Sequence, residues 1–163
     1  MISRSMRLFI AACMVVGFPA YAAKEVHEFE VSLYVPKPVF YVLPVEADWM
    51  HLNQQLEWDT LNSSLGSLRK RFDVRNDGGS ISAVLLAKPV LSNSLPGQEI
   101  VLSVLFNGHA LTDAHPVDVV TSAEARVGSR VLLEVAPMKP ARGYRPGNYY
   151  GSVHILFNAA FPL

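Results

Sequence analysis

Residues 24–35, near the start of the chain, alternate apolar and polar side chains, and this alternation constrains the fold more than any other feature. Successive side chains of an extended strand point to opposite sides, so the segment is predicted to be a β-strand with one apolar face. That face carries Phe29, Val31, Leu33 and Val35. Such a strand can pair inside its own domain, as half-buried strands generally do, or it can pair with a neighbouring chain.

The residues before this segment are typical of a secretory signal peptide. Arg4 and Arg7 precede an apolar run over residues 8–18, and Ala20-Tyr21-Ala22 supplies a small–x–small cleavage site. We therefore predict a cleaved signal peptide over residues 1–22 and one domain over residues 23–163, a length that suits a single domain.

Two other interpretations of the N-terminus are disfavoured. A membrane anchor is disfavoured because the apolar run is shorter than the roughly 20 residues that span a bilayer. A lipoprotein signal ending at Cys13 would leave an apolar stub on the processed chain. Cys13 is the only cysteine, and it leaves with the predicted signal, so the predicted domain has no disulfide and no thiolate metal site.

Charge argues against a nucleic-acid partner. Loss of Arg4 and Arg7 with the signal leaves 12 of the 14 basic residues against 14 acidic ones, and no basic stripe is present. Hydrophobic residues make up 50% of the whole chain. This content suits a well-filled core or a surface that other protein covers.

The remainder of the chain is predicted to form short strands separated by Pro, Gly, Asn and Asp. Turn signals occur at Asn76–Gly79 and at Asn107-Gly108, the favoured two-residue hairpin pair. Residues 116–126 are predicted to hold a short helix or a loop. No sustained helical period occurs, so the fold class is predicted to be an all-β sandwich. The expected strands cover residues 39–43, 55–61, 70–75, 81–87, 99–106, 109–112, 130–136 and 149–157.

With these elements in order, the chain resembles the class 5 (alternate chaperone–usher) fimbrial pilins of Gram-negative bacteria, the family of the coli surface antigen and colonization factor antigen fimbriae. The first matching stretch is the alternating N-terminal strand that runs into Pro38-Val39. The other three are Phe72–Asp77 with residues 81–91, residues 100–111 with the hairpin, and residues 132–139 with 146–153. Each motif is weak alone, whereas their order and spacing behind a signal peptide are fairly specific.

The resemblance implies an incomplete immunoglobulin-like β-sandwich that lacks one strand. A periplasmic chaperone would fill the gap first, and at the outer-membrane usher the N-terminal strand of another copy or a sibling pilin would replace it. By position, Phe29, Val31, Leu33 and Val35 would be the donor side chains. The last strand, one wall of the acceptor groove and a chaperone contact, would contribute Val153, Ile155 and Phe157. The implied function is a structural subunit of a surface fimbria, exported through the periplasm and supporting adhesion.

Two departures from the family pattern leave the type of subunit open. The C-terminal residues 158–163 are apolar and include a proline, and residues 44–66 contain both tryptophans. A minor or tip subunit that binds a host receptor is therefore an alternative to the repeating major subunit. The aromatic residues that could serve a glycan are Trp49, Trp58, Tyr144 and Tyr150.

A secreted β-sandwich enzyme is the third alternative, and the sequence gives it little support. The five histidines are scattered without metal-ligand spacing, and no Gly-x-Ser-x-Gly motif is present. We therefore predict no catalytic residue, no metal site and no cofactor.

Overall fold

The computed structural model describes residues 24–35 and 39–160, which belong to two separate units divided after Val35. The predicted signal peptide over residues 1–22 lies outside the described residues, as do residues 36–38 and 161–163. Within the described part of the chain, no helix is long and apolar enough to cross a membrane.

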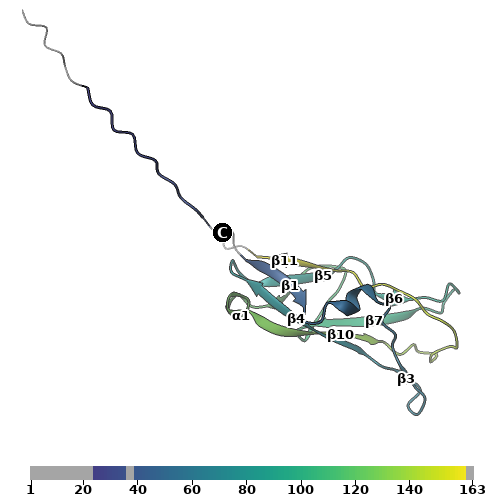
Figure 1. Ribbon diagram of the computed structural model, residues 1–163. Helices are drawn as coiled ribbons and strands as arrows, with labels where there is room; N and C mark the ends of the chain where they lie inside the picture. The colour runs from purple at the N-terminus through teal and green to yellow at the C-terminus, as the bar shows by residue number, and fades with distance from the viewer. Residues whose placement is uncertain (1–23, 36–38, 161–163) are drawn as a thin grey trace, which may run out of the picture. The chain divides into compact units, whose positions relative to one another are not determined.

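Most of the second unit is built from two antiparallel sheets (Figure 1). The larger sheet runs in the order β1-β4-β10-β7-β6, and β8 also pairs with β7. Its strands are β1 (Phe40–Pro44), β4 (Leu68–Asn76), β6 (Val90–Leu91), β7 (Ile100–Phe106), β8 (His109–Ala110) and β10 (Ser129–Pro137). The edges of this path are β1 and β6.

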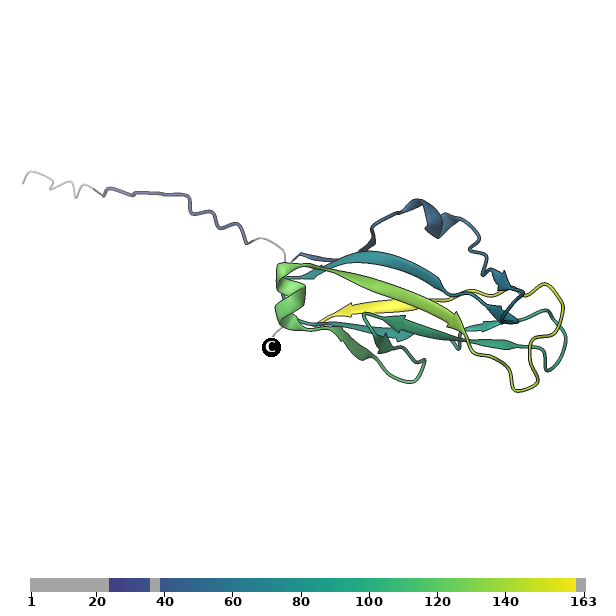
Figure 2. The ribbon, with the colours of Figure 1, turned by 90° about the horizontal axis from the view of Figure 1, so that it is seen from below.

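The smaller sheet has the order β11-β5-β9, so β11 and β9 are its edges. Its strands are β5 (Ile81–Leu85), β9 (Val117–Val120) and β11 (Ile155–Ala159). The helix α1 (Ser122–Val127) lies at the end of the sandwich where β11 ends, and a capping box between Thr121 and Glu124 begins it (Figure 2). The 3-10 helix η1 (Asp48–His51) and the short hairpin of β2 (Trp58–Asp59) and β3 (Ser64–Leu65) lie in the connection from β1 to β4.

The core lies between the facing sides of the sheets and follows the period-two pattern of the sequence. In β7, Ile100, Leu102, Val104 and Phe106 are all buried, and the intervening residues are only partly buried. Beyond β7, Asn107 and Gly108 have φ of 51° and 78°, as a type I′ hairpin turn requires. The prediction of an all-β sandwich is confirmed, and the strands predicted around residues 39–43, 70–75, 81–87, 99–106 and 130–136 are present.

The predicted strand over residues 55–61 is wrong, because only Trp58 and Asp59 are in β2. The Asp59 carboxylate accepts hydrogen bonds from the backbone N–H of Leu61 and from both the backbone and the side-chain N–H of Asn62. These local bonds favour a turn over a continued strand.

The closing strand also begins later than predicted, at Ile155 rather than Tyr149. Before it, Tyr150 forms an isolated bridge with Ser92, close to the edge strand β6 of the larger sheet. The chain therefore runs first beside one sheet and then joins the other. Residues 116–126, predicted to be a short helix or a loop, hold most of the helix α1 and in addition the strand β9, which the sequence did not indicate.

Candidate functional site

The two sides of the sandwich differ in how the sheets are joined. On the β9 side, the Asn107 side-chain amide donates to the Val119 carbonyl at 2.8 Å, and the Leu85 amide donates to the Thr112 carbonyl at 2.9 Å. On the other side, no backbone hydrogen bond joins β1 to β11 among residues 39–160. We call this β1–β11 side the open edge.

Along the open edge, β11 presents free main-chain groups next to apolar side chains. The Ala160 amide donates to Ser80, and the Leu86 amide donates to the carbonyl of His154, so the even-numbered residues of β11 pair with β5. In an antiparallel ladder, the N–H and C=O of the alternate residues then point away from β5. Those residues are Ile155, Phe157 and Ala159, whose side chains are half-buried.

In β1, across the open edge from β11, alternate residues likewise have free main-chain groups, with an interruption at Pro44. The Val45 amide donates to Arg71, and the Val39 carbonyl accepts from Asp77, so the odd-numbered residues pair with β4. The main-chain groups of Phe40, Val42 and Pro44 therefore point away from β4. Because proline has no N–H, Pro44 offers only a carbonyl to a strand arriving there.

A row of aromatic rings crosses the inner face of the sandwich from η1 to β11. The ring centroids of Trp49 and Phe72 are 6.1 Å apart, those of Phe72 and Phe106 are 5.7 Å apart, and those of Phe106 and Phe157 are 4.8 Å apart. Phe72 and Phe106 are buried, whereas Trp49 and Phe157 are only partly buried. The two outer rings, Trp49 and Phe157, therefore keep exposed surface that another chain could bury.

The end of the open edge where β1 starts is held by Asn76, the only fully buried polar residue in the described part of the chain. Its side-chain amide donates to the carbonyls of Ser80 and Ala160 at 2.9 and 3.0 Å, and its oxygen accepts from the Gly78 amide. A Cβ on Gly79 would lie 2.6 Å from the Ala160 carbonyl oxygen, so glycine is needed for this close approach. These contacts fix the end of β11 against the β4–β5 turn.

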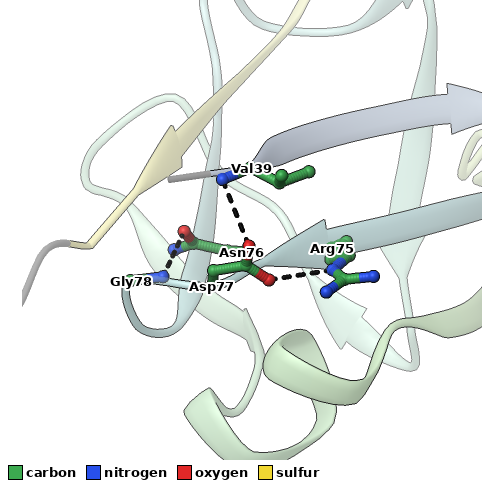
Figure 3. A network of polar contacts seen from close by, with 5 residues as sticks. All are labelled: Val39, Arg75, Asn76, Asp77 and Gly78. Carbon is green, nitrogen blue, oxygen red and sulfur yellow. Dashed lines mark hydrogen bonds and ion pairs between the residues drawn. The ribbon is translucent and has the colours of Figure 1, made fainter. Parts of the chain in front are cut away.

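Next to Asn76, Asp77 holds the first described residue of the domain (Figure 3). Its carboxylate accepts from the Arg75 guanidinium at 2.8 Å and from the Val39 amide at 3.3 Å, while its own amide donates to the Val39 carbonyl. The hydrogen bond from Arg75, with a smaller effect of the Val39 amide, lowers the pKa of the Asp77 carboxyl. Asp77 therefore anchors the chain at the start of the described part of the domain.

Residues 24–35 contain no helix or strand in this structure. The four side chains predicted to act as donors are exposed by 72% to 85%. A β-strand is stable only when neighbouring strands accept and donate its main-chain hydrogen bonds, so the segment by itself is not expected to form one. The predicted acceptor residues Ile155 and Phe157 lie in β11, and Val153 lies just before it; all three pack against the core.

The aromatic residues considered from the sequence for a glycan lie in different environments. Among the aromatic residues considered for a glycan, Trp58 packs edge-on against Tyr144 at 5.5 Å and Tyr150 is exposed, whereas Trp49 packs on the core. In the described residues, no three His, Cys, Asp or Glu side chains are close enough to bind a metal ion together.

The sequence did not predict that the open edge includes Val42, Trp49 and Asn76. Val42 lies in a continuously apolar strand, which has no period to show which face is inward. Trp49 lies in a polar connection, and Asn76 had been assigned only to a turn. The signal for Asn76 was its position at the start of the Asn76–Gly79 turn, because an Asn side chain commonly accepts from the backbone N–H two residues on, as it does here from Gly78.

The sequence of residues 25–158 matches the family described as CS1 type fimbrial major subunit. The chain belongs to this family. The match begins within the N-terminal segment and covers most of the chain, so the CS1-type fimbrial subunit is a structural protein of a cell-surface pilus and not an enzyme. The resemblance to class 5 pilins is thereby confirmed.

A solved structure supports the fold of this CS1-type subunit. The CooA pilin subunit from enterotoxigenic Escherichia coli is similar with a TM-score of 0.58 and 22% sequence identity, over 72% of this chain and 86% of the CooA chain. No curated protein sequence matches the chain.

Proposed function

We propose that this fimbrial subunit polymerises by donor-strand exchange, with residues 24–35 of one copy inserted along the open edge of the next. The observation that carries the proposal is that residues 24–35 and β11 share a two-residue period. The segment has apolar side chains at every second residue, and β11 offers free main-chain groups and half-buried apolar side chains at every second residue.

The inserted strand would pair free main-chain groups and bury apolar side chains at the same time. Its N–H and C=O groups would pair with Ile155, Phe157 and Ala159 on one side and with the free groups of β1 on the other, the mode known as β-strand addition. Its apolar side chains would cover the partly buried residues of the open edge. Those are Val42, Val153, Ile155 and Phe157.

The energy available is sufficient for a stable polymer without disulfides. Burial of four apolar side chains, Phe29, Val31, Leu33 and Val35, contributes about 1.5–3 kcal/mol each, or roughly 6–12 kcal/mol before the cost of ordering the segment. Each ladder hydrogen bond adds about 1 kcal/mol net. The contact is head-to-tail and does not close on itself, so it builds an open filament.

Before polymerisation, the open edge needs a temporary occupant, since unpaired strand edges promote aggregation. A periplasmic chaperone would supply a strand, and an outer-membrane usher would be the place where the next subunit's segment replaces it. In this proposal the assembled fibre supports adhesion from the cell surface.

The decisive experiment deletes residues 24–35 from the domain and measures chaperone binding and fibre extension separately. The open edge is intact in this variant, so we expect chaperone binding to persist. Fibre extension should stop, because the variant has no segment to donate. Normal polymerisation of the deletion variant would overturn the proposal.

A further inference from the structure

The inward residues of β11 differ in size in step with their neighbours on β5. Ala159 is the register partner of Ile81, and Phe157 is the register partner of Ala83. In each of these two rows a small side chain therefore lies beside a large one. The two β5 residues are buried with 0% exposure, whereas the two β11 residues are only half-buried. Each row is thus open on the side that faces away from β5.

The two open rows have room for side chains of different size. Close packing of a protein interior favours a large side chain beside Ala159. It favours a small one beside Phe157, whose ring centroid already lies 4.8 Å from that of Phe106. The N-terminal segment offers these sizes at successive apolar positions, Phe29 and then Val31.

The strand β1 supplies a second surface at the level of Ala159. Phe40 is the register partner of Asn76, whose side-chain amide donates to the Ala160 carbonyl at 3.0 Å. Phe40 therefore lies level with the end of β11 and on the same side of its sheet as the buried Asn76. Its side chain is 39% exposed. A large apolar side chain inserted at this level would cover Phe40 and Ala159 together.

The short distance along the chain between the segment and the domain limits the direction of the inserted strand. Residues 36–38 alone separate Val35 from Val39, so a domain begins within about 14 Å of the end of its own segment. Val39 lies at the end of the open edge where β11 ends. A strand parallel to β11 would bring the next domain to that same end, where the acceptor's own segment is attached. An antiparallel strand places the two neighbours of a subunit at opposite ends, as an open filament requires.

With an antiparallel strand, one register faces all four apolar side chains of the segment to the inward residues of the acceptor. In this register the opposite pairs are Val35 and Val153, Leu33 and Ile155, Val31 and Phe157, and Phe29 and Ala159.

The neighbouring registers fit less well. A shift of two residues in one direction sets Phe29 against Phe157 and leaves His27 beside Ala159. A shift of two residues in the other direction moves Phe29 past Ala160, away from the open row. A shift of one residue would turn the apolar face of the segment outward.

We propose that the strand inserted from a second copy runs antiparallel to β11 with Phe29 opposite Ala159 and Val31 opposite Phe157. This inference rests on the proposed donor-strand exchange and specifies its direction and register. Ala159 leaves the space that the Phe29 ring fills, and Phe157 excludes a larger side chain at position 31. The order of side-chain sizes in the two strands thus sets the register.

The first test exchanges two side chains of a synthetic peptide and leaves the acceptor unchanged. The acceptor is the full chain with Val31→Asp, which weakens its own segment as a competitor, and the probe is a fluorescent peptide of residues 24–35. A peptide with Phe29→Val and Val31→Phe has the same composition, but it sets a ring against Phe157 and leaves space beside Ala159. We expect its affinity, measured by fluorescence polarisation, to fall at least about tenfold.

The matched control exchanges the other two apolar side chains of the peptide, with Leu33→Val and Val35→Leu. The residues opposite them, Ile155 and Val153, differ little in size, so the affinity should change by less than about threefold. Equal weakening by both exchanges would overturn the register.

Cysteine pairs in assembled fibres test the direction and the register without a peptide. Each pair is made in the chain with Cys13→Ser, so that no other thiol is present. Phe29→Cys with Ala159→Cys should give ladders of disulfide-linked subunits on non-reducing gels, because opposite Cα atoms of such a pair lie about 5.5 Å apart. Two control pairs, Phe29→Cys with Phe157→Cys for a shifted register and Val35→Cys with Ala159→Cys for a reversed strand, should remain unlinked.

The two proposals fail in different ways. A ladder from either control pair in place of the first would overturn the register or the direction and leave donor-strand exchange standing. An unmodified peptide that does not bind the acceptor would overturn donor-strand exchange itself, as would fibres in which no pair forms a disulfide.

Discussion

The strand β7 and the segment of residues 24–35 have nearly the same sequence pattern and opposite environments. In β7, the apolar residues Ile100, Leu102, Val104 and Phe106 are exposed by 0% to 6%, whereas those of the segment are exposed by 72% to 85%. Both patterns specify a strand with one apolar face. The difference teaches that alternation predicts a face that needs cover and does not specify whether the same chain provides that cover.

The comparison is tested most severely by placing a charge on each apolar face. In β7, Val104→Asp should prevent folding, because an unpaired buried carboxylate costs several kcal/mol, a large share of the roughly 5–15 kcal/mol that stabilises a domain. Far-UV circular dichroism and thermal unfolding measure this. Ser103→Asp, on the other face of β7, is the matched control and should still fold. A well-folded Val104→Asp protein would contradict the assignment of this face to the core.

The corresponding change in the segment should affect assembly and leave the domain alone. Val31→Asp should leave the unfolding temperature of the domain unchanged, since Val31 is exposed in the single chain. It should weaken subunit joining at least tenfold, because roughly 1.5–3 kcal/mol of side-chain burial is lost. Fibre length by electron microscopy measures the effect.

Ser32→Asp, on the opposite face of the segment, provides the control for Val31→Asp. We expect fibres of nearly normal length, because Ser32 would face solvent in the inserted strand. Equal shortening of fibres by both substitutions would contradict the proposed facing of the segment.

The smallest effect concerns Asp77, which holds Val39, the first described residue of the domain. The hydrogen bond from Arg75 lowers the pKa of Asp77 below its usual 3.8 in the folded protein. The carboxylate therefore stabilises the fold above pH 3.8, and this contribution is lost as the pH falls through the lowered value. Asp77→Asn should accordingly lose less stability on acidification than the unmodified chain, in denaturant titrations at pH 7 and pH 3.

Hydrogen exchange separates the anchoring role of Asp77 from its general charge. Asp77→Asn should speed amide exchange at Val39, because the carboxylate accepts from that amide. Asp73→Asn removes another carboxylate with a lowered pKa, one paired with Arg130, and should leave Val39 exchange unchanged. Equal exchange at Val39 in both variants would argue against the anchor.

Much of the fold could be predicted because its signals are local. The alternation in β4, β7 and β10 identified the inward residues, and Asn107-Gly108 identified a hairpin whose positive φ values few other residue pairs adopt. The prediction of strands failed at Asp59, where a side chain competes with the backbone for hydrogen bonds. It also failed near Tyr150, where the chain passes from one sheet to the other. Both outcomes depend on contacts that no residue pattern displays.

The candidate site was predicted in part. The odd-numbered residues Val153, Ile155 and Phe157 were named from the family resemblance, and they lie beside or within β11; their role as acceptors stays a prediction. The contributions of Trp49 and Asn76 were not foreseen, because each acts through residues distant in the sequence, Phe72 for the first and Ala160 for the second.

By itself, the sequence determined most of the longer strands, their apolar faces and the family, since these follow from side-chain period and from the order of short motifs. Only the tertiary structure decided which faces the domain covers for itself. The β9 side is closed by hydrogen bonds from Asn107 and Leu85, whereas β1 and β11 keep main-chain groups free. The physical reason is that side-chain alternation is a property of one strand, whereas the pairing of a sheet edge depends on which other strands reach it.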